Sequence, residues 1–82
     1  MLVEFKYVSL KTAGMNKDQA KNLTQDALAD LPEMKTAMEE AQKQASSYGD
    51  ILENKHGNLR LRRYAVVSLG FERVWGVEVC KP

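Results

Sequence analysis

Residues 59–80 read LRLRRYAVVSLGFERVWGVEVC, two runs of alternating side chains joined at Gly70. One side of the first run is apolar and consists of Leu59, Leu61, Ala65, Val67 and Leu69. One side of the second run is also apolar and consists of Phe71, Trp75, Val77 and Val79. A period of two interrupted by a glycine turn predicts two neighbouring strands, with these sides and both aromatic rings in the core.

The start of the chain, residues 2–10, repeats this period. Val3, Phe5 and Tyr7 share one side, opposite two charged residues, as in a half-buried strand. Val8 then falls on the charged side. Either a bulge shifts the phase there, or both faces are covered at that end of the strand.

The middle of the chain has the longer period of helices. Asn16 and Gln19 have capping-box spacing and predict a helix that begins at Asn16. Its apolar stripe consists of Ala20, Leu23, Ala27, Leu28 and Leu31. Proline is tolerated in the first turn of a helix, so Pro32 predicts a second helix with Asp30 as its N-cap.

The second helix carries an apolar stripe at near-regular spacing, made of Met34, Ala37, Met38, Ala41, Ala45 and Tyr48. We expect both methionines of this stripe to pack in the core. Gly49 is a natural residue to end the helix. Whether residues 51–55 form a further short strand is left open by the pattern.

The element order is therefore β-α-α-β-β, with one more strand if residues 51–55 are extended. Residues 1–82 are expected to form a single α+β domain. In this domain, a small two-layer sandwich, a helical hairpin packs on one face of a mainly antiparallel sheet. The pattern leaves open the strand order and whether the first strand pairs parallel or antiparallel.

Composition argues against several classes of protein. The formal net charge is +1, far from the strong basic character of most nucleic-acid binders. Cys80 is the single cysteine, so the chain has no internal disulfide and a reducing compartment is favoured. The sequence has neither a signal-peptide pattern nor an apolar run of membrane-spanning length. We expect a soluble, cytoplasmic protein that makes no membrane contact.

The basic stretch from Lys55 to Arg63 is the strongest local departure from an even charge mixture. Its candidate nucleic-acid ligands are Lys55, His56, Arg60, Arg62 and Arg63. These side chains could follow a phosphate backbone, with a neighbouring tyrosine stacked on a base. The simpler interpretation is the solvated side of an amphipathic strand, protected by charge against pairing with another chain.

The side of the sheet expected to face away from the helices also carries apolar residues: Val8, Leu10, Tyr64, Val66, Val74 and Cys80. A patch of this kind usually marks an interface, unless a one-residue error in register has exchanged the two faces. The candidate protein-interface residues are Arg60, Arg62, Tyr64, Val66 and Val74. The surface would suit a homodimer, for which an edge strand joining across a two-fold axis is the simplest form, or another protein.

Chemistry-bearing motifs are missing from the sequence. It contains no Gly-rich phosphate loop, G-x-S-x-G or H-E-x-x-H motif, so no catalytic residue, metal ligand or cofactor is assigned. His56 lacks an identifiable orienting partner, and Cys80 lacks an identifiable base. The domain is more readily a binder than an enzyme.

These observations favour a small non-catalytic protein-binding domain, a regulator, adaptor or inhibitor that acts through its sheet face. Small domains of this type are often encoded by phages and mobile elements. The alternative is a nucleic-acid-binding protein that uses residues 55–63.

A third hypothesis comes from a resemblance. The order β-α-α-β-β, with basic residues on the strands, is broadly similar to the RelE/ParE toxin architecture. Some members of that family cut ribosome-bound messenger RNA and others poison gyrase, so the resemblance implies a toxin. The helical region here is not strongly basic, and the family's C-terminal catalytic region is absent or shortened.

Overall fold

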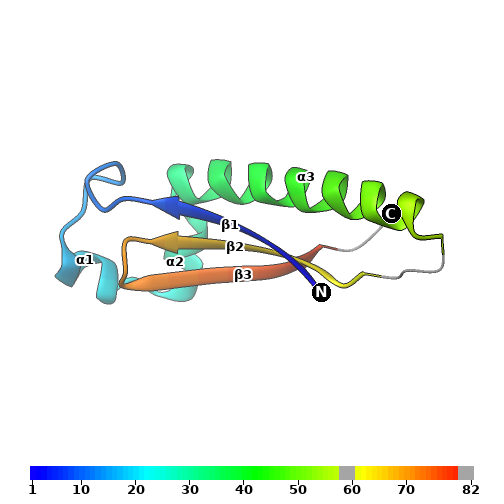
Figure 1. Ribbon diagram of the computed structural model, residues 1–82. Coiled ribbons are helices and arrows are strands. Elements are labelled where there is room, and N and C mark those ends of the chain that lie inside the picture. Colours follow the sequence, from blue (N-terminus) through cyan, green and yellow to red (C-terminus); the bar gives the residue numbers. More distant parts are fainter. Residues whose placement is uncertain (58–60, 80–82) are drawn as a thin grey trace.

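The computed structural model describes residues 1–57 and 61–79. Its elements are β1 (Leu2–Val8), α1 (Lys17–Lys21), α2 (Gln25–Asp30), α3 (Pro32–Lys55), β2 (Arg63–Leu69) and β3 (Arg73–Val79). The long helix α3 lies along one face of a three-stranded sheet (Figure 1). This arrangement confirms the α+β class and the order β-α-α-β-β, with the first helical segment divided in two.

The sheet has the order β1-β2-β3 and is mixed, not mainly antiparallel. β1 and β2 are parallel, because the helices carry the chain back to the end of the sheet where β1 begins. β2 and β3 are antiparallel and are joined by a turn in which Gly70 has a φ of 55°. The amide of Gly70 donates a hydrogen bond of 2.7 Å to the carbonyl of Val8, which ties this turn to the end of β1.

The predicted start of the first helix is confirmed. The amide of Gln19 donates to Oδ1 of Asn16 at 2.8 Å, and the amide of Asn16 donates to Oε1 of Gln19 at 3.0 Å. The prediction of one continuous helix to Leu31 is wrong, because Thr24 starts a new one. Its hydroxyl accepts a hydrogen bond of 3.1 Å from the amide of Ala27 and caps α2.

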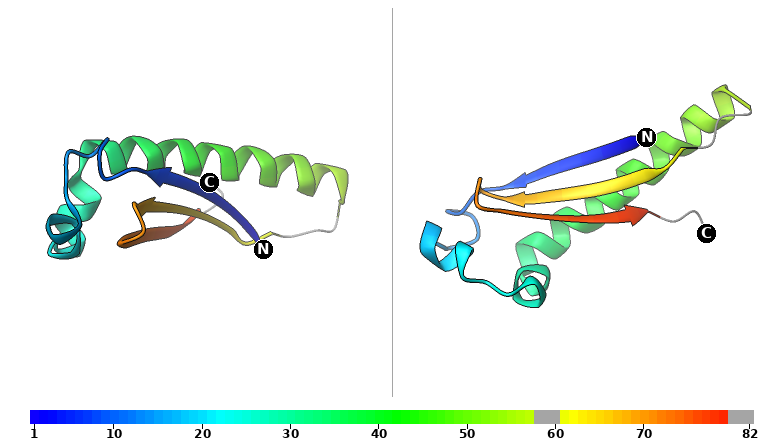
Figure 2. Two further views of the ribbon diagram at one scale, coloured as in Figure 1. Left: turned by 60° about the vertical axis from the view of Figure 1, so that its left-hand side comes forward. Right: turned by 90° about the horizontal axis from the view of Figure 1, so that it is seen from below.

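The predicted place of Pro32 in the first turn of the second helix is confirmed, but the predicted N-cap, Asp30, and the predicted end at Gly49 are wrong. Leu31 stands at the N-cap of α3 with no side-chain hydrogen bond, and Asp30 belongs to α2. At the other end the helix passes through Gly49 and continues to Lys55, so residues 51–55 are helical and not a strand. The C-terminal turns of this 24-residue helix extend beyond the end of the sheet at which β1 begins (Figures 1 and 2).

The core lies between α3 and the sheet. Its buried residues are Val8, Ala20, Leu28, Met34, Met38, Ala41, Ala65, Val67 and Leu69. Trp75, Val77 and Val79 are partly buried against this cluster. The predictions for the two methionines, for Trp75 and, on β2, for Ala65, Val67 and Leu69 are thus confirmed, whereas Leu59 lies outside the described residues.

The prediction for β1 has the correct period but the wrong face. Paired residues of neighbouring strands point to the same side, and Lys6 pairs with the buried Val67. Glu4, Lys6 and Val8 therefore lie on the α3 side, and the pairing is regular throughout, without a bulge. Val3, Phe5 and Tyr7, expected on the buried side, lie on the opposite side of the sheet.

Candidate functional site

The sheet face turned away from α3, here called the open face, is the main unpartnered surface in the part of the chain that is described. Strand register sets its residues in three rows: Val3, Tyr64 and Glu78, then Phe5, Val66 and Gly76, then Tyr7, Ser68 and Val74. Phe71, in the turn before β3, lies at the end of the face beside Tyr7. Most of these side chains are apolar or aromatic, although no helix covers them.

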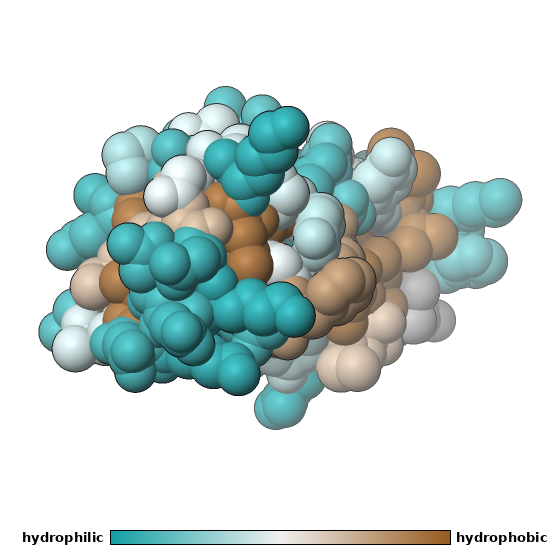
Figure 3. All heavy atoms as spheres, turned by 90° about the vertical axis from the view of Figure 1, so that its left-hand side faces the viewer, coloured by the Kyte–Doolittle hydropathy of each residue, from teal (hydrophilic) through white to brown (hydrophobic). Residues whose placement is uncertain are grey.

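The side chains that β1 and β3 contribute to the open face are well exposed, whereas Tyr64 and Val66 of β2 are half-buried and Ser68 is buried. The exposed fractions are 45% for Val3, 56% for Phe5, 52% for Tyr7 and 62% for Val74. Phe71 is 96% exposed, so its predicted place in the core is wrong. Its ring centroid lies 5.8 Å from that of Tyr7, within the range of favourable aromatic pairs. Figure 3 views the molecule from the end that contains the β2–β3 turn. Hydrophilic side chains cover most of this near end, and hydrophobic surface is visible behind them on the right.

Charge lies at one end of the open face. Glu78 is exposed in the row of Val3, and the exposed Arg62 directly precedes β2. The carbonyl of Arg62 accepts a hydrogen bond of 2.8 Å from the amide of Leu2, which holds the chain beside β1. An apolar centre with a charged margin has the composition of a protein interface.

The open face gathers part of the predicted interface set. Tyr64, Val66 and Val74 lie on it, Arg62 lies at its end, and Arg60 falls outside the described residues. The sequence analysis missed the contributions of Val3, Phe5, Tyr7 and Phe71. The sequence did contain a clue to the buried side of β1. Val8 is apolar and shares a side with the charged Glu4 and Lys6, and this side is the one that faces α3.

The basic stretch does not form a patch in the part that is described. Lys55 and His56 are exposed at the end of α3, whereas Arg62 lies at the end of the open face. Arg63 is only 3% exposed. The nucleic-acid hypothesis requires Arg63 at the surface, but the structure places it in the interior.

Arg63 is instead the centre of a buried ionic cluster. Its guanidinium donates to Asp50 Oδ1 at 3.0 Å, to Glu53 Oε1 at 2.8 Å and to the carbonyl of Ser46 at 3.0 Å. Both carboxylates come from the last turns of α3, so the cluster fastens this end of the helix to the start of β2. Its positive charge is neutralised inside the protein.

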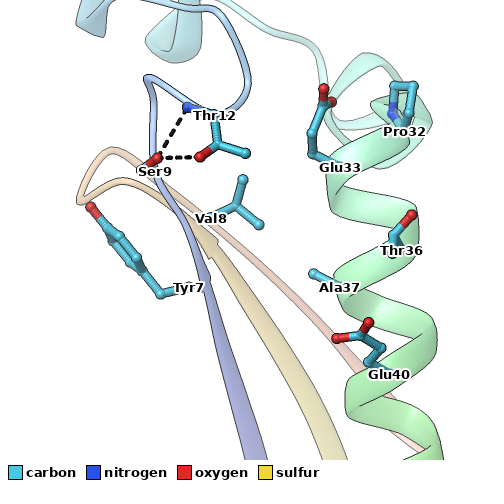
Figure 4. Close-up of a pocket in the computed structure, with 9 residues that line it drawn as sticks. All are labelled: Tyr7, Val8, Ser9, Thr12, Pro32, Glu33, Thr36, Ala37 and Glu40. Carbon is cyan, nitrogen blue, oxygen red and sulfur yellow. Dashed lines mark hydrogen bonds between the residues drawn. The ribbon is translucent and has the colours of Figure 1, made fainter.

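An open groove of about 400 Å³ runs between the end of β1 and the first turns of α3 (Figure 4). Glu33, Thr36 and Glu40 line it from the helix, and Ser9 and Thr12 from the opposite side. The hydroxyl of Ser9 accepts from the amide of Thr12 at 3.0 Å and donates to its hydroxyl at 2.7 Å. The Ser9 and Thr12 hydroxyls are thus bonded to each other and to the backbone of their own loop.

Within residues 1–57 and 61–79, no group of three His, Cys, Asp or Glu side chains is placed to hold a metal ion. In the same residues, no helix combines the length and apolarity needed to cross a bilayer. Comparisons with protein-family models, curated proteins and solved structures find no match. The resemblance to RelE/ParE toxins therefore rests on element order alone, and the open face is the best basis for a functional hypothesis.

Proposed function

We propose that this protein is a non-catalytic binding domain that acts as a regulator, adaptor or inhibitor by docking another protein on its open face. One observation carries the proposal: a regular sheet presents Val3, Phe5, Tyr7 and Val74 to solvent on the side that no helix covers. Contiguous apolar surface of this kind on a small protein usually marks an interaction site.

The energetics of the open face suit protein binding. Burying apolar surface contributes about 25 cal/mol per Å², and aromatic side chains supply the largest areas. The strands already hold the backbone at Phe5, Tyr7 and Val66 in place, so binding has to order only their side chains. A partner that covers this face with apolar side chains would gain most of its affinity there.

The test compares two variants of the full chain as baits in a cytoplasmic lysate. Phe5→Lys/Val74→Lys places two charges on the open face at positions that are already exposed. The matched control, Ile51→Lys, places a charge on an exposed apolar residue of α3, which is 61% exposed. The proposal expects a stoichiometric protein that is captured by the wild type and by Ile51→Lys, but not by the double variant.

A nuclease-treated sample separates this proposal from the nucleic-acid alternative. Capture that survives nuclease and is lost only in the open-face variant supports protein binding. Capture that disappears with nuclease, in the wild type and in the open-face variant alike, would overturn it in favour of a site that includes Lys55 and His56.

A further inference from the structure

We propose that a second copy of this chain pairs with the outer edge of β3 and joins the two sheets into one. β3 is an edge strand, since β2 is its neighbour on one side and no described residue pairs with it on the other. The proposal concerns the strand edge and the helix-side surface of β3. It does not depend on what binds the open face.

The two edges of the sheet differ in their protection against pairing. Natural proteins protect edge strands with charges that point inward, and β1 has two: Glu4 and Lys6 lie half-buried on the α3 side. β3 has no such charge between its ends, because Trp75 and Val77 occupy the corresponding positions. It also contains neither proline nor a bulge. The junction of α1 and α2 is bound at the Arg73 end of β3, so the edge is open to another strand beyond that residue.

The helix layer leaves β3 incompletely covered. α3 packs on β1 and β2 and only marginally on β3. The view from below shows the helix crossing the sheet at an angle, with the C-terminal end of β3 clear of it (Figure 2). Trp75, Val77 and Val79 are consequently only partly buried. A neighbouring strand with its own apolar residues on this side would cover them further.

The sequence of β3 is self-complementary in one antiparallel register. With a two-fold axis through Gly76, each Trp75 lies opposite Val77 of the second copy, a favourable aromatic and β-branched pair. Val74 then lies opposite Glu78 of the second copy, and Arg73 opposite Val79. No like charges face each other, and the net charge of +1 per chain causes little repulsion.

One chain has a larger accessible surface area than a compact monomer of the same mass. Its accessible surface is 5624 Å², whereas a compact monomer of its mass, 9.3 kDa, exposes about 5,000 Å². The excess is of the same order as the ~800 Å² that each partner buries in a standard interface. The radius of gyration, 14.4 Å, also exceeds the ~12 Å expected for a compact chain of this length.

The test uses charge complementation at Gly76, followed by sedimentation velocity over a dilution series. A Cβ at Gly76 would meet Val66 Cγ2 at 3.5 Å, an ordinary contact, so Gly76→Lys and Gly76→Glu should fold. The wild type is expected to dimerise. Each variant alone places like charges across the axis and is expected to associate about fivefold more weakly. The mixture should associate about tenfold more tightly than either variant alone.

Two results would overturn the edge pairing. One is a wild-type chain that remains monomeric throughout the dilution series. The other is a dimer that both Gly76 variants retain and that the open-face variant Phe5→Lys, which changes β1 and leaves β3 intact, abolishes, since that result would place self-association on the open face. A dimer that survives the open-face variant and is restored by the Lys/Glu mixture would support the edge whether or not another protein binds the open face.

Discussion

Gly49 of α3 lies directly over the side chain of Arg63 at the start of β2. A Cβ added at Gly49 would lie 2.7 Å from Cδ of Arg63, closer than such atoms approach in proteins. The glycine therefore provides space inside the interface between helix and sheet, and it does not end the helix. The buried Arg63 thus lies under a turn of α3 that continues to Lys55.

Gly49→Ala is expected to lower the free energy of unfolding by about 1–3 kcal/mol, the usual cost of overpacking. At an exposed position in a helix, the same change would stabilise by up to about 1 kcal/mol. Urea unfolding monitored by helical circular dichroism measures the difference. Gly57→Ala is the control, because nothing lies within 4 Å of the added Cβ. A more stable Gly49→Ala variant would contradict the packing described.

Arg63→Met should destabilise the fold by about 3 kcal/mol, because it removes the buried guanidinium that donates to both carboxylates of the cluster. Glu53 is the more sensitive partner, since only 15% of its side chain is exposed and its Oε2 also accepts from the amide of Leu61 at 3.1 Å. Arg62→Met, one residue away and exposed, should change stability by less than about 0.5 kcal/mol. Equal effects in the two variants would show that Arg63 is not buried in this way.

Arg73 holds the junction of α1 and α2 against the sheet. Its Nη1 donates to the carbonyl of Ala20 in α1, at 3.2 Å, and to the carbonyl of Leu23 in the link between α1 and α2. Arg73→Ala should cost about 1–3 kcal/mol and speed hydrogen exchange in residues 17–30 more than in α3. Hydrogen exchange read by mass spectrometry distinguishes these regions. Uniform acceleration over the chain would argue against this local role.

Phe71→Ser should leave stability within about 0.5 kcal/mol of wild type, because the side chain is 96% exposed. Trp75→Ser should cost at least about 3 kcal/mol, since Trp75 packs against the core. Thermal unfolding of the two variants measures the contrast. A large loss of stability in Phe71→Ser would contradict the exposed position and would indicate that the ring packs in the core, as the sequence pattern predicted.

The sequence contained the period of every strand but not the identity of the buried face. Apolar residues occupy both sides of the sheet, so alternation alone did not show which side α3 covers. In β2 the larger number of apolar residues on one side was a correct guide. In β1 the longer apolar series, Val3, Phe5 and Tyr7, is exposed. The pairing of β1 with β2 determines which side of β1 faces α3.

The helix ends show a second limit of local patterns. The capping box at Asn16 was recognised because both of its hydrogen bonds are local. Gly49 and Arg63 were misread because their roles depend on each other across 14 positions of the chain. Local propensity could not reveal that a glycine in α3 accommodates an arginine of β2. The open face was anticipated through Tyr64, Val66 and Val74, but its aromatic content was not.

The most direct test of the central claim is a nitrogen–proton correlation spectrum of the labelled full chain with and without the captured partner. The account predicts that the largest shift changes fall on amides of the open face, above all Phe5, Tyr7, Val66 and Phe71. Changes concentrated instead at Glu33, Thr36 and Glu40 in the groove, or at Lys55 and His56, would contradict it.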